Sequence, residues 1–176
     1  MMVLGVDPGS LRTGYGVIDA HRSRQRMVDK GVLVAPRRWT LPARLRFIHD
    51  GIADLIRHHD PEILAVEDAF HSVNTRTALV LGHVRGVVLL AGAEAGLPVE
   101  AFSPATVKAQ VTGYGRADKG QVALMVARIL DLPEDTEAGD AADALAVALC
   151  GAQHAQASLE REPRPASPRP PRRSAT

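Results

Sequence analysis

The hydrophobic and polar positions at the start of the chain form short apolar runs separated by turn signals. Residues 2–7 are an apolar run that ends in Asp7, and the Pro-Gly-Ser of residues 8–10 follows as a turn. Residues 15–19 and 28–34 are two further runs of this kind, and Gly31 inside the second suggests a bulge. This pattern predicts three consecutive strands joined by short turns.

Farther along the chain, apolar residues recur at helical spacing. Over residues 40–59 they lie three or four positions apart, with Thr40 as a cap and Pro42 in the first turn, so we predict an amphipathic helix. Residues 75–95 are apolar around most of the helical circumference, which indicates a buried helix with part of its surface at a dimer interface. Three more helices are expected at residues 104–111, at about 118–130 and from 137 to about 155.

Two short apolar runs lie between these helices. Residues 63–66 lead into Glu67 and have the composition of a buried central strand, and residues 99–102 form a fifth strand. Three strands, a helix, a strand, a helix, a strand and terminal helices match the element order of the ribonuclease H-like fold. We therefore expect an α/β protein with a central five-stranded mixed sheet flanked by helices.

Composition indicates the domain count and the compartment. A chain of 176 residues with 45% hydrophobic content fits one globular domain, which we place at residues 1–156. Residues 157–176 are rich in Pro, Arg and Ser and lack the apolar bulk that offsets the entropy of ordering, so we expect a disordered tail. No signal peptide and no run of about 18 apolar residues is visible, which favours a cytoplasmic protein without a membrane span. The single cysteine, Cys150, is expected to be a buried hydrophobe.

The chain as a whole is nearly neutral, but two of its stretches are basic. The formal net charge of +1 favours no class of partner. Two stretches are basic: the first contains Arg22, Arg24, Arg26 and Lys30, and the second contains Arg37, Arg38, Arg44 and Arg46. A solvated surface and a phosphate-binding track explain each stretch equally well.

Four acidic residues form the pattern that carries chemistry. Asp7 and Glu67 end two apolar strands, which the predicted element order places side by side. Asp140 and Asp143 lie three positions apart on an alanine-rich helix and therefore share one face. Taken singly, each has a commoner explanation: a turn for Asp7, a strand end for Glu67, a helix cap for Asp140. The joint pattern favours a catalytic cluster.

Such a cluster indicates a divalent cation site. Four neighbouring carboxylates repel one another unless cations neutralise them. Mg²⁺ and Mn²⁺ prefer oxygen ligands, and two ions about 4 Å apart activate water and stabilise the leaving oxygen of a phosphodiester. Nucleotide-binding motifs fail on spacing, since Asp19 stands where a dinucleotide fingerprint after Gly14 and Gly16 needs its third glycine.

Four segments in order resemble the bacterial RuvC family of Holliday-junction resolvases: LGVDPGSLRTGYGVI, AVEDAF, LGHVRG and DAADALAVAL. The resemblance covers approximately residues 1–152. It implies a homodimer that binds four-way junction DNA and makes paired symmetric nicks in recombination and repair. It also implies Mg²⁺ or Mn²⁺, with two ions per site, and cooperation with a branch-migration motor of the RuvA and RuvB type.

The resemblance also assigns residues to roles. Asp7, Glu67, Asp140 and Asp143 match the family's metal-binding catalytic acids, and Phe70 matches an aromatic that stacks on DNA. Lys108, Lys119 and Arg85 match positions for DNA contact, and Lys119 also for catalysis, although all three are also explained as ordinary exposed or paired helix residues. Asp68 departs from the pattern by placing a further acid beside Glu67.

Two other functions stay open at the level of sequence. A related ribonuclease H-like nuclease would use the same acids on RNA–DNA hybrids or other branched DNA. A non-catalytic junction-binding protein would keep the fold, but a scaffold has no need to concentrate four like charges. Cleavage assays on matched substrates, with metal and with chelator, separate these functions.

Overall fold

A five-stranded mixed sheet forms the centre of the protein, in the order β3-β2-β1-β4-β5. Its strands are β1 (Met2–Asp7), β2 (Arg12–His21), β3 (Arg24–Val34), β4 (Ile63–Glu67) and β5 (Val99–Phe102). The first three pair antiparallel, whereas β1, β4 and β5 pair in parallel. The structure, a computed structural model, describes residues 1–21, 24–68, 75–133 and 139–161. The predicted α/β architecture with a five-stranded mixed sheet is confirmed.

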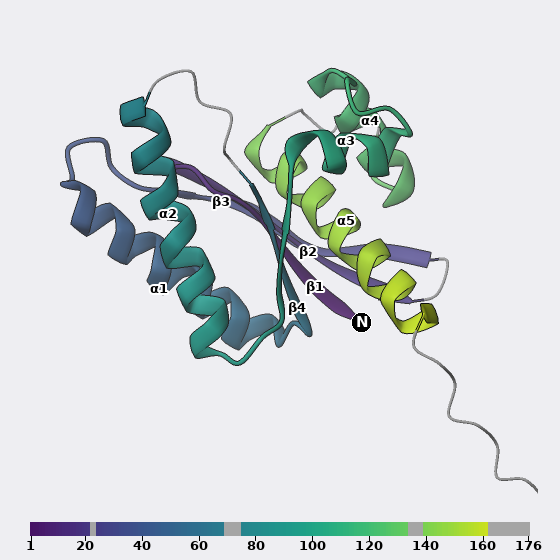
Figure 1. The fold of residues 1–176 in the computed structure, drawn as a ribbon, viewed down its shortest axis with the longest axis horizontal. Helices are drawn as coiled ribbons and strands as arrows, with labels where there is room; N and C mark the ends of the chain where they lie inside the picture. The colour runs from purple at the N-terminus through teal and green to yellow at the C-terminus, as the bar shows by residue number, and fades with distance from the viewer. Residues whose placement is uncertain (22–23, 69–74, 134–138, 162–176) are drawn as a thin grey trace, which may run out of the picture.

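Helices cover both faces of the sheet (Figure 1). Helices α1 (Leu41–His59) and α2 (Thr75–Glu94) lie on one face, and α3 (Pro104–Thr112), α4 (Lys119–Ile129) and α5 (Asp140–Arg161) lie on the other. Because side chains alternate along β1, Leu4 and Val6 enter the core under α1 and α2, while Val3 enters the core under α5. The central strands β1 and β4 are thus buried on both sides, as their near-continuous apolar sequences require.

Local signals place the helix starts. The Ser103 side chain accepts a hydrogen bond from the Thr106 N–H at the start of α3, and Asp118 and Gln121 form a capping box at the start of α4. Thr40 occupies the predicted N-cap position of α1, but its side chain makes no capping hydrogen bond. The helix that closes the domain runs to Arg161, beyond the expected end near residue 155 and into the segment predicted to be disordered. Residues 162–176 lie outside the described part of the chain.

The β2–β3 ribbon differs from the prediction in length and in the position of its bulge. Both strands extend into polar sequence, because backbone pairing between them does not need apolar side chains. Val17 pairs with Asp29 and Ile18 with Met27, so the extra residue of the bulge is Val28 rather than Gly31. Gly31 instead faces the Tyr15 ring, whose Cζ lies 2.7 Å from where a Cβ would stand.

Helix α2 is less buried than its composition predicts. It buries Val84, Val88, Ala91 and Gly92, but leaves Leu79 61% and Leu90 49% exposed. By length and composition alone α2 is long and apolar enough to cross a membrane. A single helix of this kind is weak support for a span, and here it packs on α1 and contacts β4 and β5.

Helix α5 lies unusually close to the sheet because glycines line its path. A Cβ at Gly5 would stand 2.3 Å from the Ala144 carbonyl oxygen, and one at Gly14 would stand 1.9 Å from the Asp140 carbonyl oxygen. A Cβ at Gly16 would likewise meet Leu145 at 2.7 Å. Only glycine allows the helix backbone to rest directly on β1 and β2.

Gly5→Ala is therefore expected to destabilise the fold by about 1–3 kcal/mol, because the added methyl group meets helix backbone that cannot rotate away. Gly82→Ala is the matched control, since a Cβ there has no neighbour within 4 Å and alanine favours the helix by about 0.5–1 kcal/mol. Thermal and denaturant unfolding of both variants would measure the difference. Equal stability of the two would show that α5 does not rest on β1 as described.

Candidate active site

Two acids come together where β1 and β4 end. The strands pair in parallel with Val6 opposite Val66, so the next residues, Asp7 and Glu67, leave the sheet side by side at one edge. Buried residues precede both acids, which fixes the strands in the core and the carboxylates at its border. This arrangement confirms the predicted placement of Asp7 and Glu67 at neighbouring strand ends.

The turn after Asp7 is held by a buried hydroxyl. The Thr13 Oγ1 donates to the Gly9 carbonyl at 2.7 Å and accepts from the Gly9 N–H at 3.3 Å, and Thr13 is fully buried. A Cβ on Gly9 would stand 2.0 Å from the Arg12 carbonyl oxygen, so the turn closes only with glycine there. The direction in which Asp7 leaves β1 is thus set by the turn as well as by the strand.

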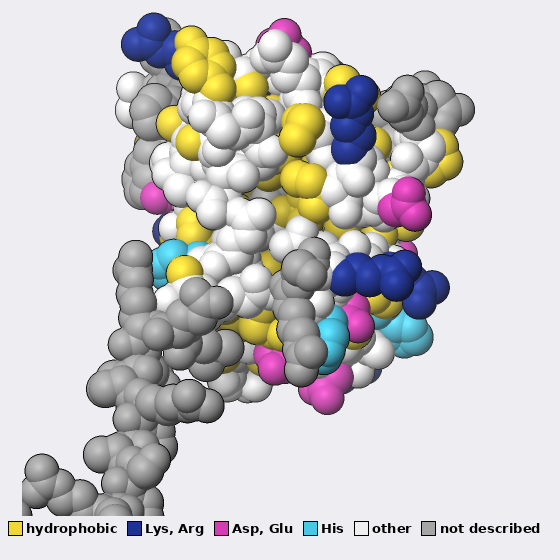
Figure 2. Space-filling model, turned by 90° about the vertical axis from the view of Figure 1, so that its right-hand side faces the viewer, with side chains coloured by type: hydrophobic (Ala, Val, Ile, Leu, Met, Phe, Trp, Pro, Cys, Tyr) yellow, Lys and Arg dark blue, Asp and Glu magenta, His cyan; other side chains and the backbone are white. Residues whose placement is uncertain are grey.

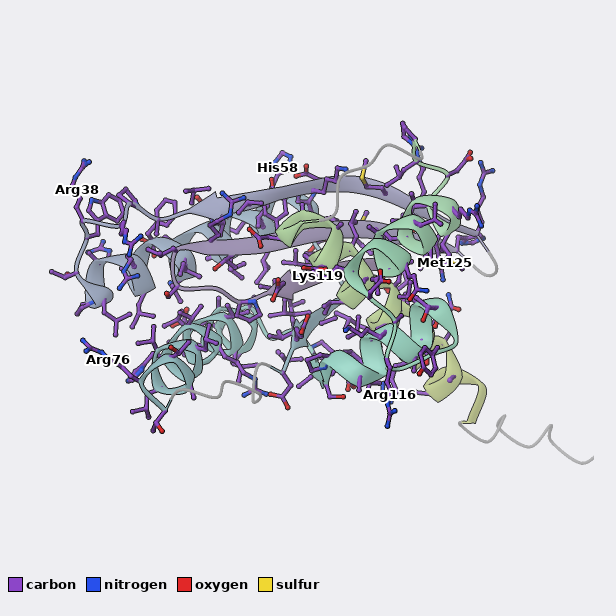
Figure 3. All side chains as sticks on the ribbon, turned by 90° about the horizontal axis from the view of Figure 1, so that it is seen from above. Arg38, His58, Arg76, Arg116, Lys119 and Met125 are labelled. Atoms are coloured by element: carbon purple, nitrogen blue, oxygen red, sulfur yellow. The ribbon has the colours of Figure 1, made fainter. Side chains whose placement is uncertain are left out.

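Helix α5 brings a third acid to the same place. Asp143 lies with Asp7 and Glu67 in a pocket of about 270 Å³. The pocket is also lined by Lys108 from α3 and Lys119 from α4. Three acids from β1, β4 and α5 therefore share one cavity with two lysines, on the edge of the sheet seen from above in Figure 3, where Lys119 lies near the middle.

Asp140 does not line that pocket. It begins α5, one turn before Asp143, and its Oδ2 accepts a hydrogen bond from the Arg12 Nε at 2.6 Å. Its charge still raises the pKa of Asp7, so it belongs to the same electrostatic cluster. The structure thus brings Asp7, Glu67 and Asp143 together and holds Asp140 at the margin.

Burial and mutual repulsion make these acids hard to ionise. Burial, followed by the charges of Asp143 and Asp140, raises the pKa of Asp7 to about 6. Burial, followed by the charges of Asp7 and Asp143, raises the pKa of Glu67 to about 7. Two carboxyl groups that titrate near neutrality, inside an acidic pocket, form a site that gains from bound positive charge.

Lys119 is the cation most closely tied to the cluster. Its Nζ lies 3.1 Å from the Asp143 Oδ2, and this hydrogen bond, followed by the charge of Asp143, raises the pKa of Lys119. A lysine held protonated cannot act as a general base, so its contribution is positive charge. Lys108 acts in the same direction, because its charge lowers the pKa of Glu67.

The donor set fits a divalent cation. Carboxylate oxygens are the ligands that Mg²⁺ and Mn²⁺ prefer, and the raised pKa values show negative charge that the protein leaves uncompensated. Within the described ranges, no three Asp, Glu, His or Cys side chains already stand at metal-ligand geometry. Arg12 and Lys119 each contact one carboxylate oxygen, that of Asp140 and that of Asp143 respectively.

The structure does not describe every residue that was predicted to contact DNA. Phe70 lies outside the described residues. Arg85 forms an ion pair with Asp68, with Nε 3.0 Å from Oδ1. Asp68 is thereby directed toward α2 and does not line the acidic pocket, so the extra acid beside Glu67 adds no ligand to that site.

Arg12 is the site residue that sequence reasoning missed. It starts β2 and is 128 residues from Asp140 in the chain, so no spacing rule connects the two. The one available signal was its place in the turn segment directly after Asp7. A basic residue there lies at the same sheet edge as the acids.

Comparison with known proteins identifies the family. The profile described as "Crossover junction endodeoxyribonuclease RuvC" matches residues 3–151. A relative of that description from Halorhodospira halophila is 50% identical over 157 residues, covering 89% of this chain and 93% of the relative. One from Desulforamulus reducens is 45% identical over 153 residues, covering 87% and 94%.

Solved structures agree with this result. Thermus thermophilus RuvC in complex with a Holliday junction substrate is 36% identical, with a TM-score of 0.84 over 90% of this chain and 96% of that one. A second structure of Thermus thermophilus RuvC is 35% identical, with a TM-score of 0.81 over 90% and 97%. The expected ribonuclease H-like fold of the resolvases is confirmed, and the chain belongs to the RuvC family of crossover junction endodeoxyribonucleases.

Proposed function

We propose that Asp7, Glu67, Asp140 and Asp143 bind Mg²⁺, with Mn²⁺ as a substitute, and that this site cuts four-way DNA junctions by paired symmetric nicks. Endonuclease chemistry follows from the family; the proposal concerns the residues, the ions and the junction as this chain's substrate. The convergence of Asp7, Glu67 and Asp143 in one pocket with Lys108 and Lys119 carries it. The junction-bound Thermus thermophilus relative supports the choice of substrate.

The acidic and the basic residues of the pocket have different roles. When bound, divalent cations supply Lewis-acid activation of the attacking water and stabilisation of the leaving oxygen. The carboxylates hold and orient the ions, and the two strand ends give Asp7 and Glu67 fixed positions. Lys119 and Lys108, from a different layer, reach the same cavity and neutralise the charge that develops on a phosphodiester there.

The ion pairs of the site also have a part in substrate binding. Arg12 and Lys119 neutralise Asp140 and Asp143 in this structure. Once those carboxylates turn to a cation, both basic groups are left beside the place that a phosphodiester would occupy. The same side chains thus stabilise the acidic site before binding and contact the DNA backbone afterwards.

Asp7→Asn is expected to reduce junction cleavage on the order of a hundredfold or more, because the amide is a poor ligand for a hard cation, while leaving junction binding intact. Cleavage of a labelled four-way junction would be measured beside duplex and RNA–DNA hybrid, with Mg²⁺ and with chelator. Cutting of the hybrid in preference to the junction would favour a different ribonuclease H-like activity. Tight binding without nicks under any metal would indicate a scaffold.

The pH dependence of stability tests the acidic cluster separately. Because the pKa of Asp7 in the folded state is about 6, above its unfolded value, the folded protein binds more protons and loses stability as pH rises from about 4 to above 6. In chelator, Asp7→Asn should therefore be more stable than the native chain at pH 8, on the order of 2 kcal/mol, with the gap closing toward pH 4.

Thermal unfolding at both pH values, with and without Mg²⁺, is the measurement. Bound Mg²⁺ stabilises the native chain and not the variant, so it should narrow the gap at pH 8. A variant less stable than the native chain at pH 8 in chelator would show that Asp7 is not destabilised by burial and repulsion.

We also propose that the exposed apolar face of α2 mediates a homodimer. Leu79 and Leu90 are exposed there and, together with Leu45 of α1, line a groove of about 790 Å³. Apolar side chains at this exposure stabilise the protein only when another surface covers them. Cooperation with a branch-migration motor of the RuvA and RuvB type, and a cytoplasmic location, stay predictions.

Leu79→Lys is expected to convert the dimer to monomer, because the charge would be buried between apolar faces. Leu124→Lys is the control, since Leu124 is a partly exposed leucine of α4, on the other side of the sheet. Light scattering of the purified variants would report their mass. A monomeric Leu124→Lys beside a dimeric Leu79→Lys would move the interface to α4.

A further inference from the structure

The loop from β3 to α1 and the first turns of α1 carry positive charge that the site above does not use. Residues 35–50 contain four arginines, Arg37, Arg38, Arg44 and Arg46, and a single acid, Asp50. Arg37 and Arg38 are exposed, and neither has an ion-pair partner among the described residues. Arg46 has a loose one, with Nε 3.5 Å from the Asp50 Oδ2. Most of this charge is therefore available to a ligand.

An exposed tryptophan lies within this charge. Trp39 is 37% exposed, and its ring meets the Phe47 ring edge-on, with centroids 5.7 Å apart. Trp39 lines a shallow groove of about 570 Å³, and the charged residues that line the same groove are Arg38, Arg46 and Asp50. Contact with Phe47 fixes the ring while leaving a face of it to the groove, so aromatic and basic groups share one surface.

This surface is joined to the active-site turn. Arg44 donates from Nη1 to the Ser10 carbonyl at 3.2 Å, and the Ala35 N–H donates to the Leu11 carbonyl at 2.9 Å. Ser10 and Leu11 belong to the turn between Asp7 and Arg12, both of which take part in the acidic cluster. Figure 3 shows Arg38 at one end of the molecule and Lys119 near its middle, with Arg116 on the far side of Lys119.

The other basic stretch lies elsewhere. In the strand register, Arg24 lies opposite His21 and Arg26 lies opposite Asp19. This end of the β2–β3 ribbon is beside Met2, where β1 begins, whereas the acidic site is where β1 ends. On the face of α3, α4 and α5, Lys and Arg side chains are spread apart (Figure 2). Sequence alone did not distinguish the two stretches, but among their described residues only those of the second are joined to the active-site turn.

We propose that Arg37, Arg38, Trp39 and Arg46 form a second DNA-binding surface that holds the sugar-phosphate backbone of a junction arm running from the active site. The inference rests on the proposed function, since it takes the junction as the ligand. Planar guanidinium groups match phosphate oxygens in pairs, and an exposed aromatic ring packs on sugar or base. Such contacts position the duplex without reading its sequence.

A purely solvated basic surface is the competing explanation. It accounts for the exposed arginines, but not for a tryptophan kept partly exposed among them by contact with Phe47. Nor does it account for the backbone links to Ser10 and Leu11, which hold the surface beside the active-site turn.

Two double variants with the same change of charge test the surface. Arg37→Ala with Arg38→Ala removes its unpaired arginines, and Arg24→Ala with Arg26→Ala removes two exposed arginines from the opposite end of the sheet. Affinity for a fluorescent four-way junction would be measured in chelator, over a range of salt. The first variant should bind roughly tenfold more weakly, with the salt slope reduced by about two, while the second stays near the native value. Equal affinities and slopes in the two variants would overturn the surface.

Intrinsic fluorescence gives a second readout, because Trp39 is the single tryptophan of the chain. Junction binding should change its emission, with the same midpoint as the affinity measurement, in the native chain and in the Arg24→Ala, Arg26→Ala control. Emission that stays constant at saturation would overturn contact with Trp39. Cleavage is scored separately: a protein that binds through this surface but never nicks junctions would overturn the proposed function and leave the surface standing.

Discussion

The close approach of α5 to the sheet is the constraint on which the rest of the structure depends. Without a Cβ at Gly5, Gly14 and Gly16, the helix backbone lies directly against β1 and β2. That contact lets Leu145 and Leu149 fill the core and places Asp143 beside the strand-end acids. A helix held away by even one methyl layer would leave Asp7 and Glu67 paired with each other but without their third partner. The same close contact therefore determines both the packing of the core and the position of the third acid.

The acidic cluster lowers the stability that this packing provides. Burial of Asp7 and Glu67 costs free energy, as their pKa values of about 6 and 7 express, and the charges of Lys119 and Lys108 offset only part of this cost. Such a site is stabilised by whatever positive charge enters it, so affinity for cations and local instability are two aspects of one arrangement. The apolar strands and the α5 contact supply the stability that the cluster lowers.

Sequence predicted what depends on short-range pattern and missed what depends on distant contact. Apolar runs ending in Asp7 and Glu67 indicated strands, and parallel pairing follows from the element order. The Arg12–Asp140 pair joins residues too distant for any spacing rule, and Arg85 of α2 pairs with Asp68, the residue that follows β4. In the sequence, Gly14 and Gly16 indicate only an incomplete nucleotide-binding motif, whereas in the structure they allow α5 to lie against β2. The bulge at Val28 reflects ribbon geometry, to which a glycine at position 31 gave a false signal.

The distribution of the site over the chain has a consequence for its biosynthesis. Asp7 is among the first residues made, Glu67 comes from the middle, and Asp143 lies on the helix that closes the described domain. On the ribosome, β1 and β4 can pair long before α5 has been translated, but the pocket has no third wall until then. A nascent or prematurely terminated chain therefore holds only part of the acidic cluster.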